Sequence, residues 1–342
     1  MKTTEEHFMT CPITPTTTSH EHPRGATPPV TGAIDFFERV AGSTFIAFYA
    51  AALFDQAMVP GVSAALEATG RVRYTPWQRA LRTAASDQLV FAGTAADREA
   101  ESRRLLDLHR DVRGTGADGE RYSALSPDLW NWILISTFFM HRNAAEALAG
   151  RTFTEAENQA VWDRFREVVA GLQLPGRGRL MESFDELTVY YDRFAADRLT
   201  VTPTLRAVVA SQRRIPRPDF LPAAVGPLWS VVTPVAGHVT GILGYGTMRP
   251  SAREVLPMRW TRRHDVEYAA FNAVLRVAFR LLPSVVTETP LVRARKKYDR
   301  LADSYRSIGL TSFRLDPPTD AVSASGSDAV ATQPVIGPRA AS

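Results

Sequence analysis

Closely spaced helix start signals are the feature that most constrains the fold of this chain. A Ser or Thr followed three residues later by Glu or Gln, the pattern of an N-terminal capping box, occurs at Thr75, Thr154 and Ser183. Thr75 and Ser126 also precede a proline, which is favoured at the first position of a helix. Alternation of apolar and polar residues, the signature of strands, is scarce. The sequence therefore predicts an all-α fold.

Glycines and prolines that end helices complete this pattern. The predicted helices run from Thr75 to about Ala92, from near Ala96 to Gly114, from Ser126 to near Gly150, from Thr154, from Ser183, from Thr202, from His264 to Leu281, and from Pro290 to about Ser307. The apolar stretch from Leu228 to Leu243 contains Pro234 and predicts a buried, kinked helix.

No internal repeat and no linker divides these helices, so we expect a single multi-helix domain over residues 31–315. A composition of 45% hydrophobic and 22% charged residues is typical of a globular protein with a sizeable core. Residues 1–30 and 316–342 are of low complexity, and we expect them to form disordered tails.

Charge and cysteine content narrow the functional classes. The net charge of +4 is spread along the chain, whereas a nucleic-acid-binding protein gathers basic residues into a patch, so we expect no nucleic-acid partner. The one dense basic run, Arg293 to Lys297, is typical of a solvated helix face. Cys11 is the only cysteine and lies in the predicted tail. It forms no disulfide within the chain, is not expected to bind a metal, and fits a cytoplasmic location.

Hydropathy predicts neither a leader nor a membrane span. Residues 1–29 are polar and lack the apolar region of a signal peptide. The apolar stretch from Phe45 to Phe54 is too short to cross a bilayer, so we expect no integral membrane segment.

Several catalytic motifs are absent from the sequence: the Glu-x-x-His pair of di-iron bundles, the His-Glu-x-x-His zinc motif, the P-loop and the Gly-x-Ser-x-Gly elbow. Gly114, Gly116 and Gly119 form one Gly-x-Gly-x-x-Gly string. A dinucleotide site needs this string between a strand and a helix, but here it follows a predicted helix and leads to no strand. We interpret it as a flexible loop that ends the helix. His264 and Glu267 lie one turn apart, and a charged surface turn is favoured there over a metal site.

Four of the seven histidines fall in the predicted core, because His7, His20 and His22 lie in the tail. His141 is placed near the end of its helix, where it would complement the helix dipole. His238 follows Gly237 in an apolar stretch, where it would either line a substrate cavity or be a hydrogen-bonded core histidine. His264 belongs to the charged turn.

His109 is the fourth and most informative histidine. It shares a helix face with Leu105, Leu106 and Val112, so its imidazole is expected to face apolar side chains. One interpretation is a structural histidine that binds a carbonyl group. The other is a haem ligand, because neutral imidazole is a common axial ligand and an apolar helical pocket suits a porphyrin.

Arg79, Arg82, Thr83 and Ser86 lie on one face of the preceding helix. Such a stripe is most often simply solvated. Beside a haem, however, the two guanidinium groups would pair with propionates or with iron-bound oxygen species, and Thr83 would donate a hydrogen bond.

Taken in order, these pieces resemble the MpaB-like oxygenases, which share a domain with the latex-clearing proteins that cleave rubber. The resemblance covers roughly residues 35–300. It rests on Arg79-x-x-Arg82-Thr83, His109-x-x-Val112-Arg113-Gly114, Gly119-x-x-Tyr122-x-Ala124-x-x-Pro127, Trp132, Ala149-Gly150-Arg151, Thr154-Glu155-Ala156-Glu157 and Glu182-Ser183-Phe184-x-Glu186-Leu187-x-x-Tyr190.

The resemblance implies an all-helical domain that encloses a pocket for haem b, with His109 as the proximal iron ligand. It also implies that Arg79, Arg82 and Thr83 lie at the haem. The rubber-cleaving relatives carry Arg-x-x-Lys-Thr at these positions, and their lysine can reach the iron. Arginine stays protonated and is a poor ligand. We therefore expect Arg82 to be a distal hydrogen-bond donor, with Arg79 as the anchor of a propionate.

Two positions depart from the family pattern. Many members carry a His-Pro pair where this chain has Val59-Pro60, and a Trp-Val-His motif where it has Trp132-Ile133-Leu134. The two missing histidines imply a drier pocket, a different substrate or a different reaction.

The sequence thus favours a haem b-dependent oxygenase that uses dioxygen or peroxide on an apolar or aromatic small molecule. Arg82 and Thr83 would be catalytic, the aromatic segment Leu129–Phe139 would wall the pocket, and by analogy the enzyme would serve bacterial specialised metabolism. One alternative is a haem enzyme without oxygen insertion, namely a peroxidase, dehydratase or cyclase, which labelled dioxygen would distinguish. The others are a non-catalytic haem-binding protein and a helical interaction protein without a cofactor, which would be colourless.

Overall fold

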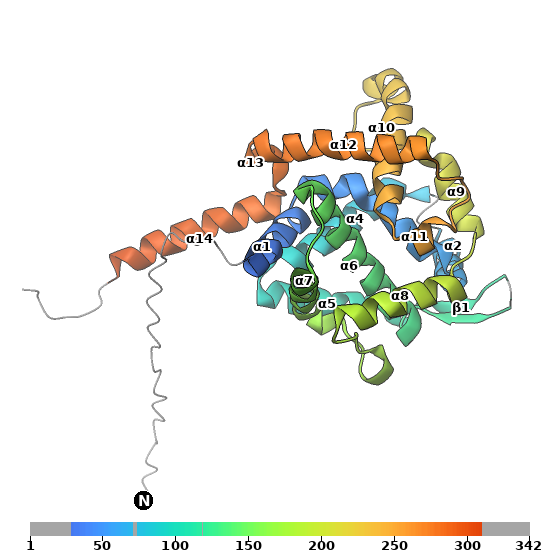
Figure 1. Ribbon diagram of the computed structural model, residues 1–342, viewed down its shortest axis with the longest axis horizontal. Coiled ribbons are helices and arrows are strands. Elements are labelled where there is room, and N and C mark those ends of the chain that lie inside the picture. The colour runs from blue at the N-terminus through green and yellow to red at the C-terminus, as the bar shows by residue number, and fades with distance from the viewer. Residues whose placement is uncertain (1–28, 71–73, 118, 310–342) are drawn as a thin grey trace, which may run out of the picture. The chain divides into compact units, whose positions relative to one another are not determined.

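Helices make up nearly all of the regular structure, as the helix signals predict (Figure 1). The computed structural model describes residues 29–70, 74–117 and 119–309. The long helical elements are α1 (Pro29–Ala41), η1 (Thr44–Met58), α2 (Pro60–Thr69), α4 (Pro76–Ala92), α5 (Ala95–Arg110), α6 (Pro127–Ala149), α7 (Glu155–Val168), α8 (Phe184–Arg198), α9 (Pro203–Ser211), α10 (Gly226–Thr247), α12 (Arg262–Leu281) and α14 (Pro290–Ile308). The short ones are η2 (Ala170–Leu172), η3 (Gly176–Gly178), η4 (Gln212–Arg214), η5 (Ala223–Val225), α11 (Pro250–Arg253) and α13 (Ser284–Thr287).

The described residues fall into two units, one that ends at Ala294 and one that begins at Arg295 within α14. The candidate site residues belong to the first unit. The predicted N-terminal boundary at residue 31 falls inside α1, which begins at Pro29. The predicted tails otherwise lie outside the described residues, as do Cys11, His7, His20 and His22, and the extent of a single domain stays a prediction.

Side-chain caps begin several helices where the sequence predicts them. Thr154 and Glu157 form both hydrogen bonds of a capping box at α7. Ser183 and Thr202 each accept a hydrogen bond from a backbone N–H in the first turn of α8 and α9. Thr75 precedes α4 as predicted, but its side chain makes no capping hydrogen bond. The prediction of helix positions is therefore confirmed at these ends, and the predicted capping box at Thr75 is wrong.

A β-hairpin replaces the predicted end of the helix that carries His109. Helix α5 ends at Arg110, and the next residues form strand β1 (Arg113–Thr115), which pairs antiparallel with β2 (Arg121–Ser123). Gly114 therefore lies in a strand, opposite Tyr122, and Gly119 adopts a left-handed φ of 83° in the connection. The predicted helix through Gly114 and the absence of strands are wrong. These three-residue strands are too short and too exposed to show alternation.

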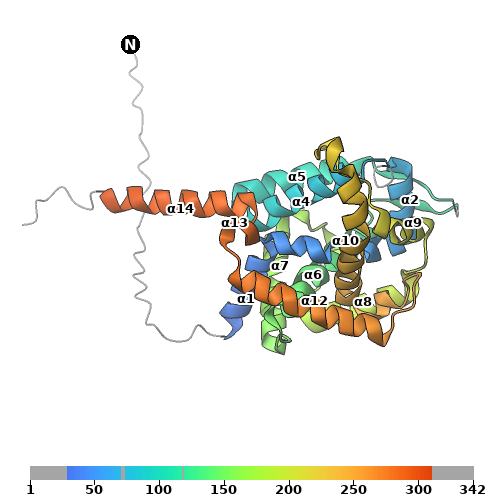
Figure 2. The ribbon, with the colours of Figure 1, turned by 90° about the horizontal axis from the view of Figure 1, so that it is seen from above.

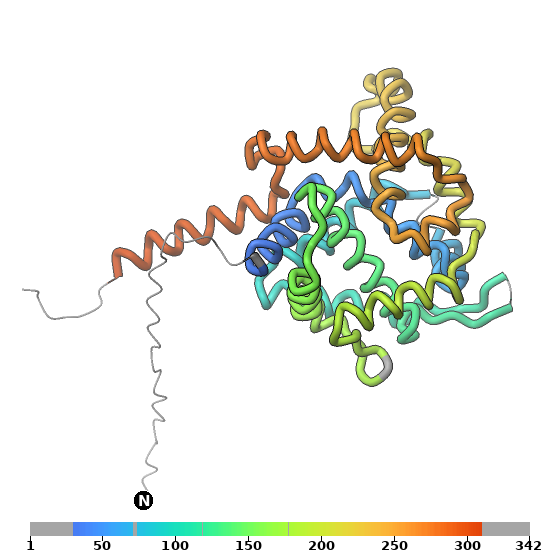
Figure 3. Tube along the Cα trace, viewed as in Figure 1, coloured from blue at the N-terminus to red at the C-terminus, as the bar shows by residue number. Residues whose placement is uncertain are grey.

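Helix α6 runs through the centre of the first unit, with η1, α1 and α7 packed around it (Figures 1 and 3). Its Trp132, Ile135 and Phe138 have no solvent exposure. Element η1 is a 15-residue 3₁₀ helix, in which side chains three residues apart eclipse one another. Four side chains in this register, Tyr49, Ala52, Asp55 and Met58, are buried. The core thus contains one carboxylate of η1, that of Asp55.

Helix α10 packs on η1 by close backbone approach. A Cβ atom added at Gly244 would lie 2.8 Å from backbone atoms of Ala51, so the contact requires glycine. The course of α10 can be followed in Figure 2. Its first half is different, since Leu228, Val231 and Val235 are exposed there, before and beside Pro234. The prediction of a helix is confirmed for this segment, whereas the prediction that it is buried holds for its second half only.

No single helix among the described residues is long and apolar enough to cross a membrane. Elements η1 and α2 together reach the required length and composition, but they meet at an angle of 108°.

Substitution of Gly244 by alanine is expected to destabilise the fold by about 1–3 kcal/mol, because the added methyl group forces α10 away from η1. The matched control is Gly32→Ala in α1, where a Cβ meets no atom within 4 Å. That change is expected to stabilise the protein by about 0.5–1 kcal/mol, because alanine is the better helix former. Urea unfolding of both variants checks this pair, and equal effects of the same sign would contradict the packing argument.

Candidate functional site

The predicted site residues lie on α4 and α5, two antiparallel helices joined by Gly93 and Thr94. Thr94 and Asp97 form a capping box that begins α5. Two turns further on, the buried carboxylate of Glu101 accepts hydrogen bonds from the Ser86 hydroxyl and from Arg104, the latter at 2.7 Å and 2.6 Å. The bonds from Arg104 lower the pKa of Glu101, so it stays ionised. The Ser86–Glu101 contact sets the register of the two helices.

This register brings the predicted residues to one level of the hairpin. Ser86 and Glu101 lie beside each other, and the two helices run in opposite directions. Residues that follow Glu101 in α5 therefore lie level with residues that precede Ser86 in α4. His109 thus lies level with the first turns of α4, which carry Arg79, Arg82 and Thr83. Arg82 and Thr83 are exposed and Arg79 is half-buried. Neither a hydrogen bond nor an ion pair holds the Arg82 guanidinium within the described part of the chain.

His109 has one ring nitrogen anchored on its own helix and the other open. Its Nδ1 lies 2.8 Å from the carbonyl oxygen of Leu105, and the edge of the ring meets Trp130, with centroids 5.3 Å apart. With Nδ1–H donating to that carbonyl, Nε2 carries the lone pair, and no described residue forms a hydrogen bond with Nε2. Metal-ligating histidines are fixed in this way. A structural histidine is expected to bind a carbonyl group, and that contact is present. Nε2, however, has no hydrogen-bond partner among the described residues.

Apolar side chains around His109 are only partly covered. Leu105 and Leu106 pack against the core, whereas Leu81 and Leu108 are 53% and 48% exposed. An imidazole with an open nitrogen, uncovered leucines and a nearby cationic helix face are the groups that a haem requires, since the macrocycle is apolar and its propionates are anionic. The residues present therefore fit a haem at this end of the hairpin.

The aromatic segment of α6 contributes less to this site than the sequence predicts. Trp130 meets His109 and donates a hydrogen bond to the Leu172 carbonyl at 2.6 Å. Trp132 and Phe138 instead pack inside the core, against Phe194 and Trp162. The remaining family-pattern positions, Val59 and Leu134, are also buried.

His141 is a buried residue whose surroundings the sequence analysis missed. It lies in the middle of α6 and is fully buried, so the predicted role at the helix end is wrong. Its Nδ1 lies 2.9 Å from the Thr137 carbonyl oxygen, and its Nε2 lies 3.2 Å from Asp87 Oδ2 in α4. Burial acts to lower the pKa of His141, but the charge of Asp87 and the Thr137 carbonyl outweigh it and raise the pKa above 6.5. This pair ties α4, the helix of Arg82, to the core.

His238 lies at a second location, between α10 and α12. Its Nε2 is 3.0 Å from Glu267 Oε2, and Arg213 donates to its Nδ1 at 2.9 Å. It lines a pocket of about 210 Å³ and its side chain is only partly buried, so a role in binding a substrate stays a prediction. His264 lines the same pocket, and its Nδ1 lies 3.2 Å from the backbone N–H of Thr261 at the start of α12. The described residues contain no group of three or more His, Cys, Asp or Glu side chains that could hold a metal ion.

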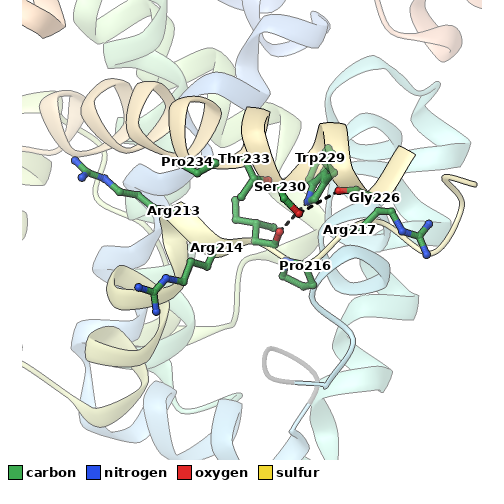
Figure 4. A pocket seen from close by; sticks show the side chains of 10 residues that line it. Arg213, Arg214, Pro216, Arg217, Gly226, Trp229, Ser230, Thr233 and Pro234 are labelled. Atoms are coloured by element: carbon green, nitrogen blue, oxygen red, sulfur yellow. Dashed lines mark hydrogen bonds between the residues drawn. The ribbon is translucent and has the colours of Figure 1, made fainter. Parts of the chain in front are cut away.

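A larger pocket of about 440 Å³ lies beside the first half of α10 (Figure 4). Trp229 and Ser230 line it, together with three arginines. Arg213 and Arg214 point to one side in Figure 4 and Arg217 to the other, so the three guanidinium groups do not converge on one ligand. The pocket has no lining residue from α5 and is separate from His109.

The fold and the site define a class: a predominantly helical protein with an anchored imidazole on the helix that follows the one carrying Arg79 and Arg82. Residues 38–277 match the family model described as ER-bound oxygenase mpaB/B'/rubber oxygenase, catalytic domain, so the chain belongs to this oxygenase family. An uncharacterized protein of Mycobacterium bovis and one of Mycobacterium tuberculosis are each 30% identical over 241 residues, which span 68% of this chain and 88% of theirs. No solved structure matches the chain significantly.

The pair of His141 and Asp87 predicts a pH-dependent contribution to stability. A raised histidine pKa stabilises the fold below the unfolded value of 6.5, and the benefit disappears as pH rises through the folded value. Asp87→Asn is therefore expected to cost about 1–3 kcal/mol at pH 6 and less at pH 9.

Urea unfolding at the two pH values measures this difference. Asp107→Asn is the matched control, because Asp107 pairs with Arg110 on the exposed side of α5. We expect that variant to change stability little at either pH. A cost of Asp87→Asn that does not depend on pH would contradict a titrating pair.

Proposed function

We propose that this protein is a haem b-dependent oxygenase with His109 as the axial ligand of the iron. The family match supports an oxygenase catalytic domain. The observation that carries the haem is the state of His109, because the Leu105 carbonyl anchors one ring nitrogen and the other is open. Neutral imidazole held through such a contact is a common haem ligand.

The cationic side chains of α4 support the same proposal. Arg82 is exposed, without a described partner, and level with His109, so it can donate hydrogen bonds to an anionic group beside the iron. Thr83 follows it and offers a hydroxyl donor. Arg79 is half-buried one turn earlier and suits a propionate, since guanidinium and carboxylate form paired hydrogen bonds.

Bound haem would supply the activation of dioxygen or peroxide, which no side chain of this protein provides. The protein residues would hold the iron, place donors where negative charge develops, and exclude water. The uncovered Leu81 and Leu108 suit an apolar or aromatic substrate next to the macrocycle. Buried Val59 and Leu134 add no polar group from the positions where many family members carry histidine, which fits a drier pocket.

His109→Gly tests the axial ligand. The hemin-loaded wild-type chain is expected to show a Soret band typical of a histidine ligand. The variant is expected to lose or shift that band and to regain it with added imidazole, because free imidazole fills the space of the missing ring. Optical titration with hemin, with and without imidazole, measures both effects.

His238→Gly is the control, because His238 binds Glu267 and Arg213 away from α5. An unchanged band in His109→Gly would move the ligand to another histidine. The absence of a Soret band in the hemin-loaded wild type would refute the haem proposal altogether.

Arg82→Lys is expected to convert the haem centre into a six-coordinate form. A lysine amine can lose its proton and bind iron, whereas a guanidinium stays charged. Lysine ligation should grow as pH rises toward the lysine pKa of about 10.4, because only the neutral amine is a ligand. Optical spectra between pH 7 and 10 follow the change, with Arg82→Gln as a control that lacks the amine. The same spectrum in the wild type, Arg82→Lys and Arg82→Gln would show that residue 82 does not face the iron.

A further inference from the structure

A buried tyrosine and a buried carboxylate meet on the far side of α6 from His109. The Tyr191 hydroxyl in α8 donates a hydrogen bond to Asp55 Oδ2 in η1 at 3.0 Å. The two side chains are 1% and 3% exposed. Asp55 Oδ1 has no hydrogen-bond partner among the described residues, so Tyr191 is the main donor to this carboxylate. Neither residue belongs to the site on α4 and α5.

Aromatic rings connect this pair to the proposed haem ligand. The Tyr191 ring lies 4.7 Å from Trp132, which stacks on Phe194 with centroids 4.4 Å apart. Trp130, two residues earlier in α6, contacts His109. Helix α6 thus places Trp130 against His109 and Trp132 against Tyr191. The two rings and the short piece of backbone between them connect the two sites.

We propose that Tyr191 is a redox-active residue that loses one electron while its phenolic proton moves to Asp55 Oδ2. The products are a neutral tyrosyl radical and a protonated Asp55, so charge and protons balance once an oxidant has accepted the electron. The oxidant would be a strong one-electron oxidant, which under the proposed function would be a peroxide-oxidised haem. For that oxidant the inference rests on the proposed function.

Tyr191 suits this role better than the other buried tyrosines. Tyr49 donates to the amide oxygen of Asn272, and Tyr245 donates to Gln212. An amide does not take up the proton, whereas a carboxylate does. Tyr190 is adjacent in sequence and packs on Phe194, but its hydroxyl has no hydrogen bond with any described residue. It is therefore the matched control for Tyr191.

The transfer requires an ionised Asp55, which makes it pH-dependent. Burial raises the pKa of Asp55 to about 7, although the hydrogen bond from Tyr191 opposes this shift. The charged groups facing the pair are Arg249, whose guanidinium lies 5.3 Å from the Tyr191 ring centre, and Asp192, which pairs with Arg249 at 2.6 Å. A group with this pKa is about nine-tenths ionised at pH 8 and one-tenth at pH 6. The radical yield should therefore rise about tenfold between these values.

Electron paramagnetic resonance of the full chain tests the proposal with two oxidants. One sample is oxidised by a flash-generated ruthenium(III) complex, which needs no haem. The other is loaded with hemin and frozen rapidly after peroxide is added. We expect a tyrosyl signal in both, narrowed by ring-deuterated tyrosine, lost in Tyr191→Phe and retained in Tyr190→Phe.

Asp55→Asn separates a redox role from a structural one. The variant keeps the shape of the side chain but removes the proton acceptor, so the yield should fall at pH 8 and lose its dependence on pH. Thermal unfolding of each variant shows whether the fold is intact. A signal that survives in Tyr191→Phe, or a yield in Asp55→Asn equal to that of the wild type, would overturn the inference.

The two oxidants keep this inference distinct from the proposed function. A Tyr191 signal from the ruthenium oxidant in a chain that binds no hemin would support the redox tyrosine and refute the haem. A hemin-loaded chain that reacts with peroxide, but gives no Tyr191 signal with either oxidant, would refute the redox tyrosine and leave the haem proposal in place.

Discussion

Glu101 holds the α4–α5 hairpin together with a buried negative charge. A carboxylate that is 4% exposed is costly unless its oxygens are hydrogen-bonded, and here Ser86 and Arg104 supply those bonds. Because Ser86 comes from the other helix, the bond fixes how α4 lies along α5. This register decides which side chains of α4 share a level with His109. A slip of one turn would move the donors of α4 by about 5.4 Å along the helix axis.

Two further buried pairs connect the outer helices to α6 and η1. Asp87 of α4 meets His141 of α6, and Tyr191 of α8 meets Asp55 of η1. Buried polar groups need partners, so each pair favours one packing of its helices over alternatives that would leave a charge or hydroxyl unpaired. The apolar core supplies the bulk of the stability, while these pairs specify where α4 and α8 lie against it.

Much of the fold follows from local signals in the sequence. The caps at Thr154, Ser183 and Thr202 and the left-handed Gly150 at the end of α6 act within one turn, so a short window of sequence reveals them. The β-hairpin could not be predicted, because its strands are three residues long and mostly exposed. The exposure of the first half of α10 could not be predicted either. An apolar helix has the same hydropathy pattern whether or not another element covers it.

Some of the site residues could also be predicted from the sequence, and others could not. His109 and the donors of α4 lie on consecutive helices with a short connection, so the sequence alone placed them near one another. The partners of the buried ionisable groups are distant in sequence: Asp87 and His141 are separated by 54 positions, and Asp55 and Tyr191 by 136. Nothing local indicates the partner of Asp55, which follows an apolar run where a carboxylate is unexpected. A charged residue at a buried register position of an apolar helix is the one signal that would have identified Asp55.

The position of α6 between His109 and Tyr191 has a chemical consequence. If a haem is bound at His109 as proposed, Arg82 would not ligate its iron, because arginine stays protonated and is a poor ligand. Peroxide could then oxidise the haem without substrate, and a residue of the protein would have to supply the missing electron. Under the two proposals, Trp130 and Trp132 would offer a route for that electron, and Asp55 would take up the proton that Tyr191 releases. An electron crosses the packed core readily, whereas a substrate or a solvated proton does not. The proton acceptor therefore has to lie within hydrogen-bond distance of the tyrosine, and in this fold a residue of η1 provides it.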